Sequence, residues 1–280
     1  MTRVAVIGAS GFVGRHVVNA LVEAGAAVVA TARDMSRLED LPIGVEPIVL
    51  DLADPAGAFV RLGRPDIVIH LAWEGLPNYG ALRHFEFELP RQYAFLRQLV
   101  LDGARTLLVA GTCLEYGMQS GELQEDMLSE PRTAYGLAKQ MLHSQLRMLA
   151  SEQPFALTWA RLFYLYGEGQ APSALYSLLQ QAIARGDPMF NMSAGEQLRD
   201  FLAVGEAAGL IAKLAMQQRG HGAVNICSGT PRSVRALVET WLSAANARMR
   251  LNLGYYPYPN YEPMAFWGSA KKLKSITGVV

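Results

Sequence analysis

The chain has 280 residues, of which 51% are hydrophobic and 18% are charged, and 25 Lys and Arg balance 25 Asp and Glu to a formal net charge of zero. Because nucleic acids and anionic membranes select a basic excess that this chain lacks, we expect neither as a partner. Its two cysteines, Cys113 and Cys227, are too few for a disulfide framework and have no metal-ligand spacing, so we expect no metal.

Short apolar runs alternate with longer amphipathic segments over the first two thirds of the chain. The predicted strands are residues 4–7, 27–31, 47–50, 67–71, 106–110 and 156–162. The helices expected between them are residues 11–24, 55–62, 81–101 and 133–151. Such alternation indicates repeated βαβ units, so we expect an α/β fold with a doubly wound parallel sheet.

The pattern changes after about residue 165. Helices are expected at residues 174–185, 204–218 and 234–245, separated by Gly, Pro and Asn, and the aromatic and Pro-rich residues 254–267 indicate a loop. Because no low-complexity linker intervenes, this part should pack against the sheet as a smaller lobe. We expect a dinucleotide-binding domain over residues 1–165 and a substrate-binding lobe over residues 166–280, with segments that interleave.

The N-terminal residues enter a strand pattern directly, without the basic and long apolar segments of a secretion signal. No apolar run reaches the ~18 residues that are needed to cross a membrane. We therefore expect a cytoplasmic protein that does not span a membrane.

A glycine-rich turn joins the first predicted strand to the first predicted helix. Its GxxGxxG spacing permits a tight turn and a close approach of backbone to phosphate, while the helix N-terminus stabilises negative charge. A glycine-rich turn without a ligand is the alternative. We expect a Rossmann-type domain that binds the pyrophosphate of NADP or NAD through Gly8, Ser10, Gly11, Phe12, Val13 and Gly14.

The choice between the two dinucleotides depends on the end of the second predicted strand. NAD-binding Rossmann domains place an acidic residue there for the ribose hydroxyls, whereas an arginine suits the 2′-phosphate of NADP. This chain has Arg33 and Arg37, with Asp34 as the nearby carboxylate, so we expect NADP, with NAD as the alternative. Both arginines could instead be ordinary surface charges. Asp51, after the third strand, can bond the adenine region or cap a helix.

Tyr135 and Lys139 are four residues apart on one predicted helix, so their side chains share a face. A free tyrosine is a poor acid–base catalyst at neutral pH, and an adjacent ammonium lowers its pKa by stabilising the phenolate. We expect Lys139 to lower the pKa of Tyr135 in this way. Two exposed residues on a helix are the alternative.

Together these motifs resemble the extended short-chain dehydrogenases/reductases of the NAD-dependent epimerase/dehydratase type. The resemblance rests on residues 8–14, on His70-Leu71-Ala72, on Thr112 before Tyr116-Gly117, and on residues 135–139. Residues 161–167, 199–201 and 225–229 fit as well and extend it over nearly the whole chain. Members of this family act mostly on nucleotide sugars, by 4-epimerisation, dehydration or ketoreduction.

The resemblance implies a role for each matching residue. Thr112 corresponds to the catalytic Ser or Thr that bonds the reacting sugar oxygen, Tyr135 to the proton donor, and Lys139 to the residue that holds the phenol and the nicotinamide ribose. Arg199 corresponds to the residue that binds the nucleotide diphosphate, with an ion pair to Asp200 or Glu206 as the alternative. Further expected cofactor contacts are Leu52, Leu71, Ala72, Trp73 and Leu162.

Several positions depart from the family pattern. Sugar-nucleotide 4,6-dehydratases have an acid directly after the threonine, where this chain has Cys113 and Leu114, so dehydration is disfavoured. Fucose-type 3,5-epimerase-reductases have a Cys and a His where this chain has Leu114 and Gly169, so that activity is disfavoured too. We interpret Cys113 as a packing residue.

The expected substrate contacts are also atypical. Tyr164 stands where many members have an Asn at the substrate diphosphate, and Glu115 precedes Tyr116 where an apolar residue is common. We expect Glu115, Tyr116, Tyr164 and Arg199 to contact the substrate. The alternative for Glu115 is a carboxylate that backbone N–H groups satisfy.

We therefore expect an NADPH-dependent reductase of a nucleotide-linked 4-keto-6-deoxysugar. A 4-epimerase with tightly bound NAD is the first alternative, and a non-catalytic NAD(P)-binding sensor is the second. The two helices at residues 81–101 and 133–151 hold more apolar side chains than one buried face needs, among them Phe85, Phe95, Met141 and Met148. Relatives often dimerise through these helices, so we expect a homodimer.

Overall fold

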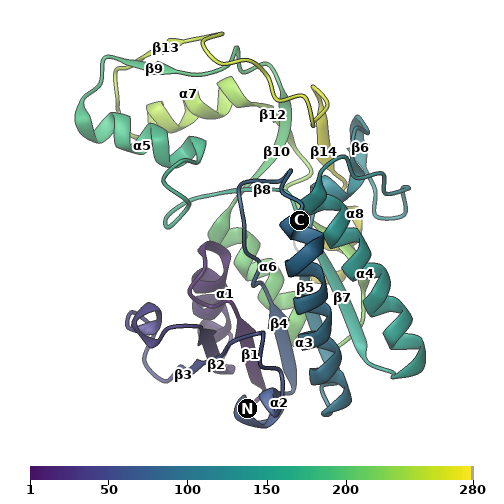
Figure 1. Ribbon diagram of the computed structural model, residues 1–280. Coiled ribbons are helices and arrows are strands. Elements are labelled where there is room, and N and C mark those ends of the chain that lie inside the picture. Colours follow the sequence, from purple (N-terminus) through teal and green to yellow (C-terminus); the bar gives the residue numbers. More distant parts are fainter. Residues whose placement is uncertain (279–280) are drawn as a thin grey trace.

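A parallel sheet forms the centre of the computed structural model, which describes residues 1–278 (Figure 1). Within these residues seven strands run in the order β11-β7-β5-β4-β1-β2-β3. They are β1 (Arg3–Ile7), β2 (Ala27–Ala32), β3 (Glu46–Val49), β4 (Ile67–His70), β5 (Thr106–Thr112), β7 (Ala156–Leu162) and β11 (Gly222–Ile226). The order reverses at β1, as it does in doubly wound sheets, so the predicted α/β fold is confirmed.

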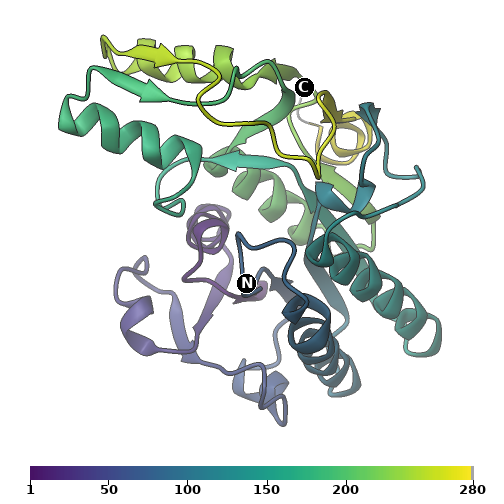
Figure 2. The ribbon, with the colours of Figure 1, turned by 45° about the horizontal axis from the view of Figure 1, so that its top comes forward.

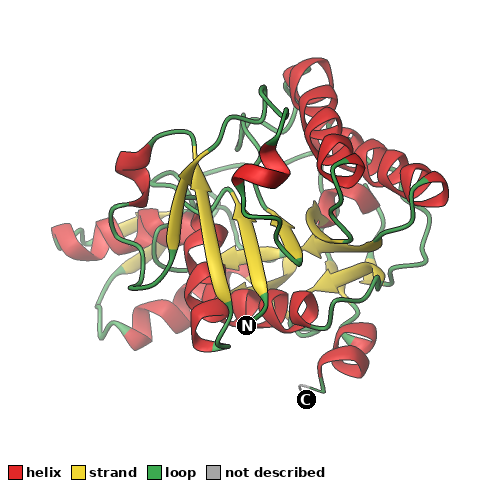
Figure 3. Ribbon diagram, turned by 90° about the horizontal axis from the view of Figure 1, so that it is seen from below, coloured by secondary structure: helices red, strands yellow, loops and turns green. Residues whose placement is uncertain are grey.

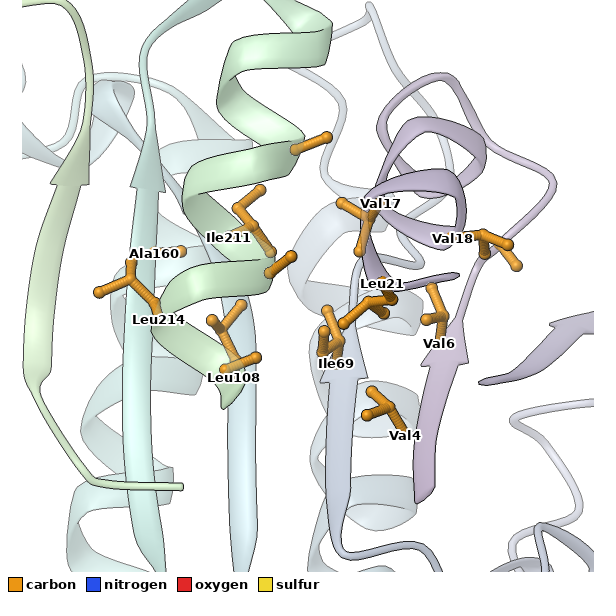
Figure 4. Packing of buried hydrophobic residues seen from close by; sticks show 14 of the residues in the cluster. Val4, Val6, Val17, Val18, Leu21, Ile69, Leu108, Ala160, Ile211 and Leu214 are labelled. Carbon is orange, nitrogen blue, oxygen red and sulfur yellow. The ribbon is translucent and has the colours of Figure 1, made fainter. Parts of the chain in front are cut away.

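Helices cover both faces of this sheet (Figure 3). One face carries α1 (Phe12–Glu23) and α6 (Val204–Met216), whose residues Val17 and Ile211 pack toward strand side chains such as Ile69 (Figure 4). The other face carries α2 (Ala58–Arg61), α3 (Leu89–Leu101) and α4 (Ala134–Glu152). Successive strand residues point to opposite faces, so apolar residues along the whole strand become buried.

Two predicted helices differ from their expected bounds. The expected helix at 55–62 shortens to α2, because Gly57 before it has a left-handed conformation with φ +65°. The expected helix at 81–101 divides into a π-helical turn, η2 (His84–Glu88), and α3. Pro90 stands in the first turn of α3 and lacks an N–H, so the regular hydrogen-bond ladder cannot run through this point.

Residues after 165 contribute to both parts of the molecule. The chain returns to the large sheet with α6 and with β11, which pairs with β7. Among the other elements, α5 (Leu175–Arg185) and α7 (Val234–Ala244) pack around Leu179, Phe190 and Trp241 and form a smaller lobe (Figure 2). Segments after residue 165 therefore contribute to the large sheet as well as to the smaller lobe.

Short strands account for most of what the sequence did not predict. They are β6 (Gly121–Leu123), β8 (Tyr164–Tyr166), β9 (Met189–Asn191), β10 (Leu198–Ala203), β12 (Pro231–Ser233), β13 (Arg250–Asn252) and β14 (Phe266–Gly268). Three short helical elements complete the fold: η1 (Met35–Leu38), η3 (Cys113–Tyr116) and α8 (Lys271–Thr277). The expected loop at 254–267 thus ends in a strand, because β14 pairs with β6.

In the part of the chain that the structure describes, none of the helices combines the length and the apolar composition needed to cross a membrane.

Candidate active site

The turn from β1 to α1 requires glycine at two positions. Gly8 has φ +87°, and a Cβ there would lie 2.8 Å from the backbone nitrogen of Ala72. A Cβ on Gly14 would collide with the carbonyl oxygen of Gly8. Gly11 is the N-cap residue that precedes α1, and its N–H donates to the Gly8 carbonyl at 3.0 Å. Strand, turn and helix N-terminus therefore form a backbone cradle that suits a pyrophosphate.

A cavity of ≈ 200 Å³ lies beside this cradle, at the carboxyl ends of β1, β2 and β4. Most of the expected cofactor residues line it: Gly8, Ser10, Gly11, Arg33, Asp51, Leu52, Leu71, Ala72 and Trp73. Phe12 and Val13, in the first turn of α1, and Leu162, at the end of β7, stand outside its wall. The glycine cradle, apolar walls and charged rim fit an adenine dinucleotide, and the contacts of the last three residues stay predictions.

The charged groups of this cavity are arranged differently from the expectation. The Arg33 guanidinium lies 2.6 Å from the carboxylate of Glu74, a residue that the sequence analysis missed. Asp34, the carboxylate that could have favoured NAD, accepts a hydrogen bond from the Ser36 N–H at the start of η1, and this bond lowers its pKa. Asp51 lines the cavity and also accepts a hydrogen bond from the Ala53 N–H at 2.9 Å. Glu74 lies four residues after the end of β4. Its position at the carboxyl edge of the sheet is the sequence signal that could have identified it as a residue of the cofactor site.

The predicted catalytic residues come together where β5 meets α4. The Thr133 side chain accepts a hydrogen bond from the Gly136 N–H and thereby caps α4, which places Tyr135 and Lys139 one turn apart and both buried. The Lys139 ammonium donates to the Ala110 carbonyl at 2.7 Å. Thr112 ends β5 and is paired with the Tyr135 hydroxyl by a side-chain hydrogen bond. The structure therefore places all three side chains at one point of the sheet edge.

Aromatic rings enclose this point. The Trp73 ring centroid lies 4.0 Å from the Lys139 ammonium, and Trp73 donates from its Nε1 to His84 Nδ1 at 3.1 Å. The ring centroids of Tyr79 and His84 lie 5.7 and 5.3 Å from that of Tyr135. His84 and Tyr79 were not singled out in the sequence, because neither belongs to a motif.

Burial dominates the ionisation of this site. It raises the pKa of the Tyr135 hydroxyl far above its ordinary value, and the hydrogen bond with Thr112 opposes the rise only in part. It also lowers the pKa of Lys139 to about 7, against the attraction of Glu115 and Glu88. The pKa of Tyr135 is thus raised in this structure, where the sequence predicted a lowered one, and desolvation is the largest cause.

Two of the expected substrate residues are fully buried. The Glu115 carboxylate accepts hydrogen bonds from Arg161 at 2.8 Å, from Trp159 at 2.9 Å and from the Thr112 N–H at 2.9 Å. The Tyr116 hydroxyl donates to Asn225 at 2.8 Å. Neither side chain is exposed to a substrate, so the alternative for Glu115, a carboxylate satisfied within the protein, describes it better, with side chains as the main donors.

The other two expected substrate residues share a partner. The Arg199 guanidinium pairs with Glu262 at 3.0 Å, and the Tyr164 hydroxyl bonds the same carboxylate. The ion pair considered for Arg199 with Asp200 or Glu206 is absent from the described residues, because Asp200 instead accepts hydrogen bonds from the backbone N–H groups of residues 228 and 229. Glu262 lies in the expected loop and was missed.

Cys113 is buried and packs with Tyr116, Phe163 and Cys227. Burial raises the pKa of its thiol, so it stays protonated at neutral pH. This agrees with its interpretation as a packing residue.

The model of the NAD dependent epimerase/dehydratase family matches residues 4–227, which include the cradle, β5 and α4. The chain belongs to this family. It is therefore an NAD(P)-dependent enzyme of the short-chain dehydrogenase/reductase type, and the predicted family and class of cofactor are confirmed.

Relatives in this epimerase/dehydratase family act on nucleotide sugars. The chain is 28% identical to a dTDP-6-deoxy-L-talose 4-dehydrogenase (NAD(+)) of Aggregatibacter actinomycetemcomitans, over 94% of this chain and 98% of that protein. It is 26% identical to a GDP-6-deoxy-D-mannose reductase of Pseudomonas aeruginosa, over 99% of this chain and 91% of that protein. The solved structure of MoeE5 in complex with UDP-glucuronic acid and NAD superposes with a TM-score of 0.81 at 26% identity, over 99% of this chain and 93% of that one. The chain thus belongs with enzymes that modify nucleotide sugars.

Proposed function

We propose that this enzyme transfers hydride between NAD(P) and C4 of a nucleotide-linked 6-deoxyhexose, and that it works as a reductase of the 4-keto form. The observation that carries the proposal is the convergence of Thr112, Tyr135 and Lys139 beside the dinucleotide cradle. The names of the two curated relatives, a 4-dehydrogenase and a reductase of 6-deoxyhexoses, support the same reaction.

The chain's own residues can handle the proton of this reaction. The nicotinamide, when bound, supplies the hydride that reaches C4. Tyr135 donates its hydroxyl proton to the carbonyl oxygen, which becomes the 4-hydroxyl. Thr112 bonds the same oxygen and holds it beside Tyr135. Lys139, whose pKa lies at about 7, is near enough to stabilise the phenolate that remains.

The side chains after β5 argue against dehydration. Elimination of water needs an acid–base group near C5 and C6, whereas the residues after Thr112 are a buried thiol and a leucine. Glu115, the next carboxylate, is held in the interior by Arg161. This arrangement favours ketoreduction or 4-epimerisation.

The test is to incubate the purified enzyme with NADPH or NADH and a dTDP-, GDP- or CDP-linked 4-keto-6-deoxyhexose. We expect one equivalent of reduced cofactor to be consumed for each sugar that is reduced. The absorbance of the reduced nicotinamide measures this consumption. Tyr135→Phe is the control and should be inactive. Interconversion of two 4-hydroxy sugars without net cofactor consumption would indicate the epimerase, and absence of any turnover would contradict the proposal.

We also propose that the enzyme is a homodimer that is built through α3 and α4. Met148 is 71% exposed and Met141 42% exposed on α4, and Phe87 before α3 is 66% exposed. Such apolar side chains favour a protein contact. Phe95, one of the apolar residues expected in excess on these helices, lies fully in the core.

A further inference from the structure

Arg33 and Glu74 meet in the cavity beside the glycine cradle. Arg33 follows β2 and Glu74 follows β4, and these two strands flank β1, which leads into the cradle. Both side chains line the same ≈ 200 Å³ cavity as Gly8 and Gly11. The guanidinium and the carboxylate lie 2.6 Å apart.

Glu74 is held in this position from behind. Its carboxylate also pairs with Arg91 at 3.0 Å, and its backbone N–H donates to Glu88 at 3.3 Å. Glu88 is fully buried and accepts hydrogen bonds from Arg91 at 2.9 Å and from Gln92 at 3.1 Å. Glu74 therefore keeps a partner when Arg33 turns to another anion.

Arg33 is less constrained. Its side chain is 54% exposed, against 29% for Glu74, so it can exchange one anionic partner for another at a small cost. Among the described residues, the cavity wall carries guanidinium groups from Arg33, Arg37 and Arg91 and carboxylates from Asp51 and Glu74. Arg33 can therefore pair either with the Glu74 carboxylate or with the phosphate of a bound ligand.

NAD and NADP differ at one group, the 2′ position of the adenosine ribose. A 2′-phosphate accepts paired hydrogen bonds from an arginine and is repelled by a carboxylate. A 2′-hydroxyl donates a hydrogen bond to a carboxylate, which NAD-binding Rossmann domains commonly supply from the end of the second strand. This chain has Arg33 at that position, and Glu74 brings a carboxylate to the same cavity from the strand on the other side of β1.

We propose that Arg33 and Glu74 form a two-way selector through which the enzyme accepts both NADP(H) and NAD(H). Arg33 binds the 2′-phosphate of NADP(H). The Glu74 carboxylate accepts a hydrogen bond from the 2′-hydroxyl of NAD(H), and its repulsion of the 2′-phosphate sets how strongly NADP(H) is preferred. The inference rests on the proposed reductase function, but it concerns binding of the cofactor before any sugar reacts.

The experiment measures the Kd of NADPH and of NADH by calorimetry for the wild type, Glu74→Gln and Arg33→Ala. For the wild type we expect the two Kd values to agree within about tenfold. Glu74→Gln should shift their ratio about tenfold or more toward NADPH, and Arg33→Ala about tenfold or more toward NADH. Glu86→Gln, an exposed neighbour that loses the same charge, is the matched control and should leave the ratio unchanged.

An unchanged ratio in Glu74→Gln, or a shift of the same size in Glu86→Gln, would overturn the proposal. If circular dichroism shows that Glu74→Gln does not fold, the affinities of the wild type for 5′-AMP, 2′-deoxy-5′-AMP and 2′,5′-ADP are measured instead. We expect 5′-AMP to bind about fivefold or more tightly than its 2′-deoxy form, and equal affinities would contradict a role for Glu74. Because these readouts involve no sugar, the selector can hold even if the proposed reductase reaction fails.

Discussion

Tyr135 and Lys139 lie one helical turn apart in a dry environment, and burial acts on them in opposite directions. The phenol is kept protonated, as a proton donor must be, and the ammonium loses its proton near neutral pH. The sequence predicted the pair from its spacing, but the effect of burial depends on Trp73, Tyr79 and His84, whose positions no motif encodes. The same holds for Glu74, which only the packing of β4 against β1 brings to Arg33.

The lowered pKa of Lys139 predicts how stability changes with pH. Its pKa is 10.5 in the unfolded chain and about 7 in the folded one, so between these values the unfolded chain binds more protons and stability rises with pH. Below about pH 7 the buried ammonium destabilises the fold in full. Lys139→Met removes this dependence.

We therefore expect Lys139→Met to gain stability over the wild type at about pH 6.5 and to lose at least about 1 kcal/mol of that advantage by about pH 9.5. Urea unfolding of both proteins at the two pH values measures the difference. Parallel pH profiles would show that Lys139 keeps its ordinary pKa in the folded enzyme.

Glu115 gives a second prediction at this scale. Its carboxylate neutralises Arg161 inside the protein, so Glu115→Gln leaves that guanidinium buried without a counter-charge. We expect the free energy of unfolding to fall by about 3 kcal/mol in urea titrations, whereas Glu122→Gln on the surface should change it by less than about 0.5 kcal/mol. A stable variant with a raised KM would instead assign Glu115 to the substrate.

At the scale of elements, long amphipathic segments were predictable and short strands were not. The helices α1, α4 and α5 follow their apolar periodicity closely, since many residues contribute to each pattern. A three-residue strand such as β8 or β14 is too short to show alternation, and it forms because a partner strand lies beside it. Tyr164, an expected substrate contact, lies on one of these short strands, β8.

The junction of α1 with the cradle predicts a specific effect. Gly14→Ala places a Cβ against the Gly8 carbonyl oxygen, so we expect about 1–3 kcal/mol less stability and loss of measurable cofactor binding. Gly209→Ala in α6, where a Cβ would meet no atom within 4 Å, is the matched control and should stabilise by about 0.5–1 kcal/mol. Thermal unfolding with and without NADPH distinguishes the two. Undiminished binding in Gly14→Ala would show that the cradle tolerates a wider turn.

At the scale of the whole molecule, the large sheet supplies the cofactor site and the smaller lobe lies beside its carboxyl edge. The chain passes between the sheet and the lobe several times. The alternation of apolar runs predicted the first six strands of the sheet, but it did not predict β11, which pairs with β7.

The outer faces of α3 and α4 remain available for a second copy. We expect light scattering to give twice the chain mass of 30.6 kDa, and Met141→Lys with Met148→Lys to give a folded monomer. A monomeric wild type would exclude the dimer.

The transfer of hydride to C4 is tested most directly with a labelled cofactor. Reduced NAD(P) that carries deuterium on the transferred face of the nicotinamide is incubated with the enzyme and a nucleotide-linked 4-keto-6-deoxyhexose, and the product is analysed by mass spectrometry and NMR. We predict one deuterium at C4 of the sugar and none elsewhere, and no product from the control variant Tyr135→Phe. A product that forms without deuterium at C4 would contradict the account.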